Sequence, residues 1–513
     1  MPAASSWYSR DMLLLTLLWV LIAVAEGMLY ADRPVVELHT RCWLLRGTLG
    51  AGLVVTVALL LGDWQVWLVP AVLEAYRLIN GVRFLRQRLA LPRLNSIALR
   101  AHYWLALLQA VAVVVGWLVA QLHDGSVLLA MVAALQLLGV LALVRSSVHT
   151  WRHTAAFTGA EPMTDRELPS LSVLVPARNE TDALQRCLEQ LLASDYPKLE
   201  IIVYDDASSN RRTPEIIRGF AHDGIRFVPG GEPDETHWLA KNWAYDRLRQ
   251  EASGELLLFC GVDALFQPQT LRRLVEVLEQ RGKDMLSILP LKDAGVRSSA
   301  SLLQPMRYYW ELCLPRRFFK RPPVLSTCWL VRATMLDRVG GFRAVSRSIT
   351  PEAYFARQAV VTDAYSFIRS DEELGIYSAK PVSEQYATSV RTRYPQLHRR
   401  LELVAVAALL ELVVLAGPVI GLACSWLLPH ALPYVLLWAV CVLGLLVTYY
   451  LAAVATGLNN LLLAWLVMPI AFACDIIMLH ISLYKYEFSH VEWKGRDVSG
   501  PVMQVIPRLP KLD

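Results

Sequence analysis

The sequence is poor in charged residues and has no pattern of paired cysteines. Only 19% of its 513 residues are charged and 55% are hydrophobic, which is too apolar for an ordinary soluble enzyme. The eight cysteines include no Cys-x-x-Cys pair, which favours a reducing compartment and argues against a metal finger. The net charge of +5 is small for this length and gives no indication of nucleic-acid binding. We therefore expect no nucleic-acid partner and a chain that lies partly in lipid.

The apolar residues gather in long segments near the two ends of the chain. A membrane-spanning helix needs about 20 such residues. Before the central region the segments are Met12 to Tyr30, Leu49 to Ile79, Tyr103 to Leu122 and Val127 to Val144. After it they are Leu401 to Leu428, Tyr434 to Thr456 and Leu458 to Leu483. We predict transmembrane blocks of about four helices at residues 1–150 and about three at residues 401–484, with a basic aromatic tail at residues 485–513.

Two of these segments allow a second interpretation. Gly62 and Asp63 interrupt the segment from Leu49 to Ile79, which forms either one span with an interfacial helix or two short spans. The first segment contains Ala23-Val24-Ala25, which resembles a small-residue cleavage site. That segment is therefore either a span or a signal peptide.

Positive charge predicts the orientation of the chain. The linker before the third segment is rich in arginine, namely Arg77, Arg83, Arg86, Arg88, Arg93 and Arg100. The next loop contains only His123 and Asp124 as charged or titratable residues. By the positive-inside rule the linker faces the cytoplasm, and the hairpin of spans after it returns the chain to the same side. We expect a multi-pass protein of the cell membrane, of the bacterial inner-membrane type, with residues 151–400 in the cytoplasm.

The C-terminal block does not fit three plain crossings, because these would place the basic tail from Trp493 to Arg496 outside. We therefore expect a re-entrant or interfacial segment near Gly417-Pro418, or near Asn459, Asn460 and Pro469, where helix continuity is weakest. Glu411 and Asp475 lie inside the apolar segments, where a carboxylate is costly. They indicate either a substrate path or structural pairing.

The central region has the strand and turn pattern of an α/β domain. Leu171 to Pro176 is a short apolar strand that leads through a polar turn to a helix. Leu199 to Tyr204 is a second strand, which ends at once in Asp205-Asp206. Polar residues at strand ends predict a ligand crevice in an open parallel sheet, where nucleotides bind. Alternatively, Asp205 and Asp206 only cap the next helix.

A third strand ends on a carboxylate. Gly254 to Asp263 contains a run of apolar residues after a glycine turn, and a helix follows Pro268. A diphosphate leaving group needs a hard divalent cation, and carboxylates at strand ends hold Mg²⁺ or Mn²⁺. Asp263 is the expected metal ligand, with a helix cap as the alternative.

These elements form an ordered series of motifs. The series is Pro176 with Asn179-Glu180, Asp205-Asp206, Lys241, Asp263 with Pro268, Gly340-Gly341-Phe342, and Gln396-Leu397-His398-Arg399-Arg400. Across residues 168–400 it resembles glycosyltransferase family 2, whose members have a GT-A fold, a Rossmann-like α/β architecture. The resemblance implies a Mg²⁺ or Mn²⁺ cofactor and a nucleotide-sugar donor. It places the nucleotide near Pro176, Asn179, Glu180, Asp205, Asp206 and Lys241.

Three motifs depart from the family pattern. The metal motif Asp-x-Asp is Gly261-Val262-Asp263 here, so only its second acid remains. The acidic base motif is Pro351-Glu352, and the resemblance implies that Glu352 accepts the proton of the acceptor hydroxyl. The Gln-x-x-Arg-Trp motif ends in Arg400 instead of tryptophan.

The last motif implies residues that contact the acceptor and the leaving diphosphate. The resemblance places Gln396 near the acceptor or the diphosphate and assigns Arg399 to the leaving diphosphate. Arg400 binds either an anionic acceptor or lipid head groups, and Trp329 lies where the family lines its acceptor pocket. The alternatives are a solvated helix position for Glu352 and a juxtamembrane basic cluster for Gln396 and Arg399.

The motifs imply an inverting transfer of a sugar from a nucleotide-sugar, most simply a UDP-sugar, to a lipid or membrane-associated acceptor. A second interpretation is a processive polysaccharide synthase that elongates and secretes a glycan. The altered motifs allow a third, a catalytically silent membrane scaffold. The expected partners are the donor, a lipid or glycan acceptor and membrane lipids, and the oligomeric state stays open.

Overall fold

The structure is a computed structural model that describes residues 4–31, 37–87, 92–121, 125–155, 162–233, 237–293, 295, 303–316, 322–427, 432–458 and 460–499. The chain divides into two compact units. The first comprises Met1–Leu137, Leu397–Trp438 and Leu483–Ser489. The second comprises Leu138–Gln396, Ala439–Ser482 and His490–Asp513.

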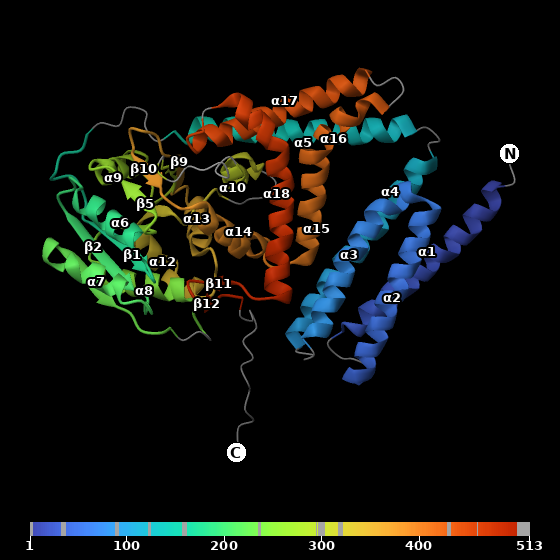
Figure 1. Cartoon of the computed structure of the whole chain (residues 1–513), viewed down its shortest axis with the longest axis horizontal. Helices are drawn as coiled ribbons and strands as arrows, with labels where there is room; N and C mark the ends of the chain where they lie inside the picture. The colour runs from blue at the N-terminus through green and yellow to red at the C-terminus, as the bar shows by residue number, and fades with distance from the viewer. Residues whose placement is uncertain are drawn as a thin grey trace, which may run out of the picture. The chain divides into compact units, whose positions relative to one another are not determined.

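The first unit begins with long helices (Figure 1). These are α1 (Ala4–Leu29), α2 (Leu38–Gly62), α3 (Trp64–Arg86) and α4 (Pro92–Gln121), followed by the start of α5 (Gly125–His153). Asp63 separates α2 from α3, because its backbone leaves the helical region and its carboxylate accepts a hydrogen bond from the Val66 amide at 3.4 Å. The apolar segment from Leu49 to Ile79 is therefore two helices.

Seven helices within the described residues are long and apolar enough to cross a membrane, which indicates a multi-pass membrane protein. Four precede the central region and three follow it, and α3 is not among them. The candidate segments are Asp11–Leu29, Leu38–Gly62, Leu94–Leu118, Leu129–His153, Leu401–Leu427, Leu432–Ala455 and Leu461–Phe488.

The segment from Leu401 to Leu427 changes its helix type in the middle. It consists of α15 (Leu401–Leu410), a π-helix (Glu411–Ala416) and α16 (Gly417–Cys424), with a 3₁₀ turn at its end. Pro418 has no N–H to donate to the preceding turn, which is a physical reason for the wider turn before it. The helix α18 (Leu461–Phe488) continues through Pro469 without a break, and Asn459 lies outside the described residues.

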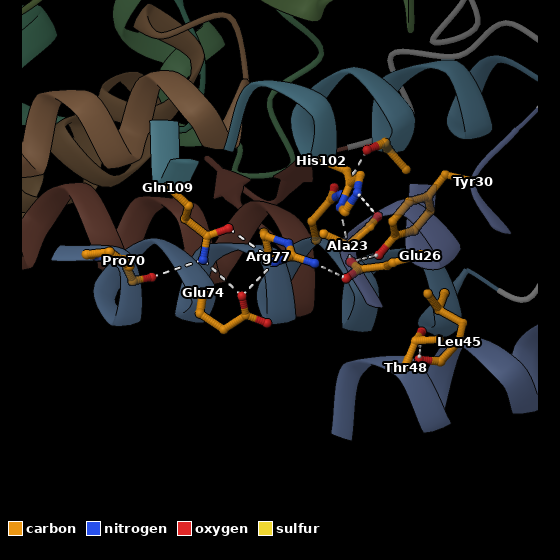
Figure 2. Close-up of polar contacts among 12 residues, drawn as sticks. Ala23, Glu26, Tyr30, Leu45, Thr48, Pro70, Glu74, Arg77, His102 and Gln109 are labelled. Atoms are coloured by element: carbon orange, nitrogen blue, oxygen red, sulfur yellow. Dashed lines mark hydrogen bonds and ion pairs between the residues drawn. The ribbon is translucent and has the colours of Figure 1, made fainter. Parts of the chain in front are cut away.

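A buried polar network joins α1, α3 and α4 in the first unit (Figure 2). The Arg77 guanidinium contacts a Glu26 carboxylate oxygen at 2.5 Å and a Glu74 carboxylate oxygen at 2.8 Å. Gln109 donates to Glu74 at 2.9 Å, and the His102 ring lies 3.2 Å from the other Glu26 oxygen. Arg77, which the sequence placed in the arginine-rich linker, lies within α3, and its side chain is buried in these ion pairs.

The second unit contains an α/β domain with a seven-stranded sheet in the order β3-β2-β1-β4-β8-β6-β9 (Figure 1). The strands are β1 (Leu171–Ala177), β2 (Leu199–Asp205), β3 (Ile225–Pro229), β4 (Leu256–Cys260), β6 (Met285–Leu289), β8 (Cys328–Arg332) and β9 (Tyr365–Arg369). The strands expected to be parallel, β1 and β2, are parallel, whereas β8, for which no direction was predicted, enters antiparallel between β4 and β6. The other neighbours are parallel.

Alternate residues of the central strands pack on opposite faces of this sheet. Val173 and Val175 of β1 pack with one set of helices, α6 (Asp182–Leu192), α7 (Arg212–Gly219) and α9 (Thr270–Gln280). Leu174 of β1 and Phe259 of β4 pack with another set, α8 (Ala240–Glu251), α12 (Ala333–Arg338) and α13 (Pro351–Val361). Because both faces are covered, the strands are apolar at nearly every position.

Smaller elements complete the second unit. A three-stranded sheet has the order β5-β10-β7, and a two-stranded hairpin lies in the tail. Their strands are β5 (Ala264–Phe266), β7 (Leu291–Lys292), β10 (Ile376–Ser378), β11 (Glu492–Trp493) and β12 (Arg496–Asp497). The remaining helices are α10 (Gln304–Cys313), α14 (Val382–Gln396), most of α17 (Leu432–Ala455) and most of α18.

Candidate active site

The chain order of the sheet reverses at β1, which has β2 on one side and β4 on the other. In an open α/β sheet the ligand crevice lies at the carboxyl ends of the strands at such a switch point. Pro176 lies within β1, beside Tyr204 of β2. Residues 178–180 follow β1, Asp205 ends β2 with Asp206 directly after it, and residues 261–263 follow β4, so the three predicted motifs meet at this edge.

Two of the predicted nucleotide-binding residues hold the turns in place. The Asn179 amide oxygen accepts a hydrogen bond from the Ser209 amide at 2.9 Å, and Asn179 itself has a positive φ of 51°. The Asp205 carboxylate accepts from the Ser208 amide at 3.1 Å. These contacts are local and tie the turn after β1 to the turn after β2.

Two further carboxylates at this edge are paired with the C-terminal hairpin. Asp206 is only 1% exposed, and both of its oxygens lie 2.7 Å from Nη1 of Arg496. Glu180 accepts from Nζ of Lys494 at 2.8 Å. Burial raises the pKa of Asp206 and of Glu180, and the paired cation opposes that rise in each case.

Asp263 lies in the turn between β4 and β5. Its carboxylate is 3.5 Å from Nζ of Lys380, and its carbonyl accepts from the Ala379 amide at 2.8 Å. Burial alone would raise the pKa of Asp263, but Lys380, the backbone and Arg307 together hold this pKa below its ordinary value. The lowered pKa favours the ionised form of Asp263, whose side chain is 16% exposed.

The missing first acid of the metal motif has a steric explanation in this conformation. A Cβ atom at Gly261 would come within 2.5 Å of Oδ1 of Asp263. The Asp263 side chain thus fills the space that a side chain at position 261 would need. An aspartate there would force the Asp263 carboxylate to move.

The donor atoms present fit a divalent cation only in part. No group of three or more His, Cys, Asp or Glu side chains that could hold a metal occurs within the residues that the structure describes. Oδ2 of Asp263 is buried and makes no hydrogen bond to any described residue, although it lies 3.5 Å from Nζ of Lys380. One carboxylate can hold Mg²⁺ or Mn²⁺ when a diphosphate supplies further oxygens, as metal sites of phosphate-transferring enzymes do. Asp263 fits a cation that arrives with a diphosphate.

Glu352 and Lys241 are charged groups of the same domain that influence each other electrostatically. Glu352 begins α13 directly after Pro351 and is 3% exposed, and Lys241 lies in the first turn of α8. Burial raises the pKa of Glu352, and the Lys241 charge opposes that rise. Burial likewise lowers the pKa of Lys241, against the charge of Glu352. Oε2 of Glu352 is buried without a hydrogen bond to the described residues.

The structure places Trp329, which the resemblance puts at the acceptor pocket, inside the domain in this conformation. Trp329 is 0% exposed and lies in an aromatic cluster of the domain core. Its ring stacks on Phe259 at a centroid distance of 4.2 Å and on Phe355 at 5.9 Å. The alternation of β8 points Trp329 into this core, which no single motif reveals.

The last predicted motif is divided between the two units. Gln396 is the final residue of α14 in the second unit, whereas Arg399 and Arg400 belong to the first. Nη2 of Arg399 lies 3.7 Å from Glu487 and its guanidinium covers the Tyr486 ring at 5.0 Å. Nε of Arg400 contacts Glu402 at 2.8 Å. Both arginines therefore form ion pairs with glutamates of the first unit.

Three cations at the crevice were missed by sequence reasoning. Lys380 pairs with Asp263, while Lys494 and Arg496 pair with the acids after β1 and β2. The basic tail at Trp493 to Arg496 was the feature of the sequence that could have indicated Lys494 and Arg496. Arg496 and Asp206 are 290 residues apart, so the pairing itself was not visible in any local pattern.

Comparison with known proteins agrees with this geometry. Residues 172–340 match the family described as Glycosyl transferase family 2. The chain contains a glycosyltransferase family 2 domain. Its mixed sheet is covered by helices on both faces. Asp206, Lys241 and Asp263 lie within the family 2 match, and Glu352 lies beyond it.

The family 2 domain is similar to curated glycosyltransferase sequences. The chain is 25% identical over 224 residues to Glycosyltransferase AglE of Haloferax volcanii, which is 42% of this chain and 69% of that protein. It is 27% identical over 188 residues to Probable glycosyltransferase YdaM of Bacillus subtilis, which is 34% of this chain and 44% of that protein. The chain thus spans less than half of the second relative.

A solved structure gives a similar comparison. The mannosyltransferase PcManGT from Pyrobaculum calidifontis, solved with GDP-Man and Mn²⁺, is 20% identical to this chain and has a TM-score of 0.41. The alignment covers 67% of this chain and 99% of PcManGT.

Proposed function

We propose that this protein is an inverting membrane glycosyltransferase that moves a sugar from a nucleotide-sugar, most simply a UDP-sugar, to a lipid or membrane-associated acceptor. The family 2 domain supports the reaction class. The seven candidate spans support an acceptor that is held at or in the membrane. The second unit is proposed to face the cytoplasm, where nucleotide-sugars are made.

The observation that carries this proposal is the buried carboxylate of Glu352. Its Oε2 makes no hydrogen bond to the described residues, so it has room to accept a proton. Burial raises its pKa, which makes it a better base than an ordinary glutamate while Lys241 favours its ionised form. In the proposed reaction Glu352 accepts the proton of the acceptor hydroxyl. The oxygen then attacks the anomeric carbon and the bond to the nucleotide diphosphate breaks.

The donor is proposed to bind at the carboxyl ends of β1, β2 and β4. Asp206 contacts the base or ribose, and Lys241 lies on the side of the reacting sugar. Asp263 would hold Mg²⁺ or Mn²⁺ together with the donor, and the cation when bound would neutralise charge on the leaving diphosphate. The direct displacement needs no covalent enzyme intermediate.

The buried Asp475 is explained by structural pairing. Its carboxylate forms an ion pair with Arg393, and it accepts from the Trp310 indole at 2.8 Å. A carboxylate in an apolar helix that has two direct partners is explained by pairing. It therefore gives no support to a glycan path through the second unit.

The test is nucleotide release by purified full-length protein with membrane lipids, Mg²⁺ or Mn²⁺ and a panel of UDP- and GDP-sugars. We expect release with at least one donor and its loss in Asp263→Asn and Glu352→Gln. Matched controls are Asp165→Asn and Glu215→Gln, which change exposed carboxylates of the same domain. Both controls should keep the wild-type rate.

The products distinguish the functional alternatives. Release that depends on an added lipid acceptor and gives one sugar per acceptor supports the proposal. A polymer product would replace it with a processive synthase. No release from any donor in wild-type protein, with the controls equally silent, would contradict the transferase proposal and favour a scaffold.

A further inference from the structure

Lys380 is held beside Asp263 by the register of the three-stranded sheet. Ser378 of β10 pairs antiparallel with Ala264 of β5, the residue after Asp263. The Ala379 amide then donates to the Asp263 carbonyl at 2.8 Å, which continues this pairing by one residue. Lys380 follows directly, and its Nζ lies 3.5 Å from Oδ2 of Asp263. Backbone pairing therefore places Lys380 at the carboxylate.

Two buried side chains anchor the backbone of Lys380. Its carbonyl accepts a hydrogen bond from Nζ of Lys292 and another, at 3.0 Å, from Nε2 of Gln385. The side chain of a lysine, in contrast, is a flexible four-carbon stem that ends in a compact charge. The ammonium group of Lys380 can therefore turn to another partner while its backbone stays in place.

Cations gather around Lys380 and Asp263. Burial lowers the pKa of Lys380, and the Asp263 charge opposes that fall. The charges of Arg307 and Arg391 lower this pKa further, while the Glu384 charge raises it by less. Nη1 of Arg307 is buried and makes no hydrogen bond to any described residue. Clustered cations with an unsatisfied N–H suit a ligand that brings phosphate groups.

In this arrangement Lys380 competes with a divalent cation for Asp263. The ammonium group is already 3.5 Å from Oδ2, so a second cation on the same carboxylate meets a like charge at close range. Gly261 replaces the first acid of the metal motif, so that position supplies no further negative charge to offset the repulsion. A nucleoside diphosphate does supply it, because its phosphate oxygens can pair with Lys380.

We propose that Lys380 keeps divalent cations off Asp263 until the nucleotide binds, and that it then contacts the diphosphate of the donor. This inference rests on the proposed function, because it takes Asp263 as the metal ligand. In the donor-free protein Lys380 neutralises Asp263. When the nucleotide arrives, Nζ of Lys380 turns to a diphosphate oxygen and leaves the carboxylate to the cation. Metal and nucleotide therefore bind cooperatively, and Lys380 is the source of the coupling.

Mn²⁺ binding to the full-length protein in phosphatidylcholine nanodiscs tests the competition, with the EPR signal of free Mn²⁺ as the readout. In wild type we expect saturating UDP to tighten Mn²⁺ binding by at least about 10-fold, after correction for Mn²⁺ held by free UDP. Mn²⁺ that binds wild type as tightly without UDP as with it overturns the proposal, whatever the variants do.

Two variants of Lys380 separate its charge from its packing. In Lys380→Gln the competing charge is gone, and we expect Mn²⁺ alone to bind about 10- to 100-fold more tightly than to wild type. Lys380→Arg keeps the charge and should keep the weak binding of wild type. The double variant Lys380→Gln/Asp263→Asn should lose the gain, which assigns it to Asp263.

Nucleotide affinity tests the contact with the diphosphate. With saturating Mn²⁺ we expect UDP to bind Lys380→Gln about 10-fold more weakly than wild type, because one charged hydrogen bond is lost. Uridine lacks the diphosphate and should bind both proteins equally. The matched control is Lys283→Gln, since Lys283 is 19% exposed against 18% for Lys380 and pairs with Asp363 at 3.0 Å. This control should leave Mn²⁺ and UDP binding unchanged.

The outcomes separate this role of Lys380 from the proposed function. If Mn²⁺ binds Lys380→Gln no more tightly than wild type, or if the gain persists in the double variant, the competition for Asp263 is overturned. An equal loss of UDP and uridine binding in Lys380→Gln contradicts the diphosphate contact and indicates a structural role. Failure of UDP and GDP to bind any of these proteins contradicts the proposed donor class, and the role of Lys380 with it.

Discussion

Buried charges occur in two regions of the molecule, and the two groups are built differently. In the first unit Arg77 contacts Glu26 and Glu74 directly, at 2.5 and 2.8 Å (Figure 2). In the crevice of the second unit Asp263 lies 3.5 Å from Lys380, and Glu352 keeps an oxygen without a hydrogen bond to the described residues. Oε1 of Glu74 is also without a hydrogen bond to the described residues, so the two groups differ in the distance of the paired cation. Directly paired charges fix packing, whereas a buried carboxylate whose cation is more distant can accept a proton or a cation. The comparison distinguishes a structural network from a reactive one.

Removal of the proposed base Glu352 should have the largest effect on catalytic activity. Glu352→Gln keeps the size of the side chain but cannot accept a proton, so we expect kcat to fall by about 10²- to 10⁴-fold. The affinity for UDP should stay at the wild-type value, because Glu352 is placed on the acceptor side. Turnover and UDP binding of the same preparation measure both. A raised Kd for UDP with unchanged kcat would contradict the assignment.

Removal of Arg77, at the centre of the first-unit network, should cause the largest loss of stability. Arg77→Met leaves Glu26 and Glu74 buried without their cation, which should lower the free energy of unfolding by about 3–5 kcal/mol. Thermal unfolding in detergent measures the loss. Arg46→Met, an exposed arginine of α2, is the matched control and should be near wild type. Equal Tm values for the two variants would show that the network is not structural.

A smaller loss is expected from the aromatic core. Trp329→Phe replaces the indole, which stacks on Phe259 and Phe355, with a smaller phenyl ring. We expect the free energy of unfolding to fall by about 1–2 kcal/mol. Because Trp329 is buried, the KM for the acceptor should not change. An acceptor KM that rises without any loss of stability would instead place the indole in the acceptor pocket.

The smallest expected change is a shift of the pH profile. Glu352 works as a base only when it is ionised, so activity is lost as the pH falls through its raised pKa. Lys241 opposes the rise in that pKa, and Lys241→Met should therefore move the acidic limb of kcat/KM to higher pH. Rates of the two proteins across a pH series measure the shift. If the acidic limb stays in place or moves to lower pH, Lys241 does not lower the pKa of Glu352.

Local patterns predicted the elements of the crevice well. The strand expected at Leu171 to Pro176 is β1 (Leu171–Ala177), and that expected at Leu199 to Tyr204 is β2 (Leu199–Asp205). Both are short apolar runs that end in polar turns, so the signal lies within a few adjacent residues. The antiparallel β8 was not predicted, because strand direction depends on how distant segments meet.

Contacts between distant segments account for the side chains that were misjudged. Arg77 was placed with the surface arginines, although its partner Glu26 lies 51 residues away on another helix. Trp329 was placed in a pocket, although strands β4 and β8 bring it onto Phe259. A sequence motif gives the residue type at a position, and the packing around that position decides whether the side chain reaches a ligand.

The sequence by itself determined the apolar blocks, the α/β pattern between them and the order of the motifs, because hydrophobic length and strand periodicity are properties of adjacent residues. Tertiary structure alone decided which charges are paired. Asp206 and Arg496 are 290 residues apart in the chain and form an ion pair. Lys380 and Asp263 are also distant in the sequence and lie close together in the fold. Electrostatic interaction depends on distance in space and on burial, and neither can be read from positions along the chain.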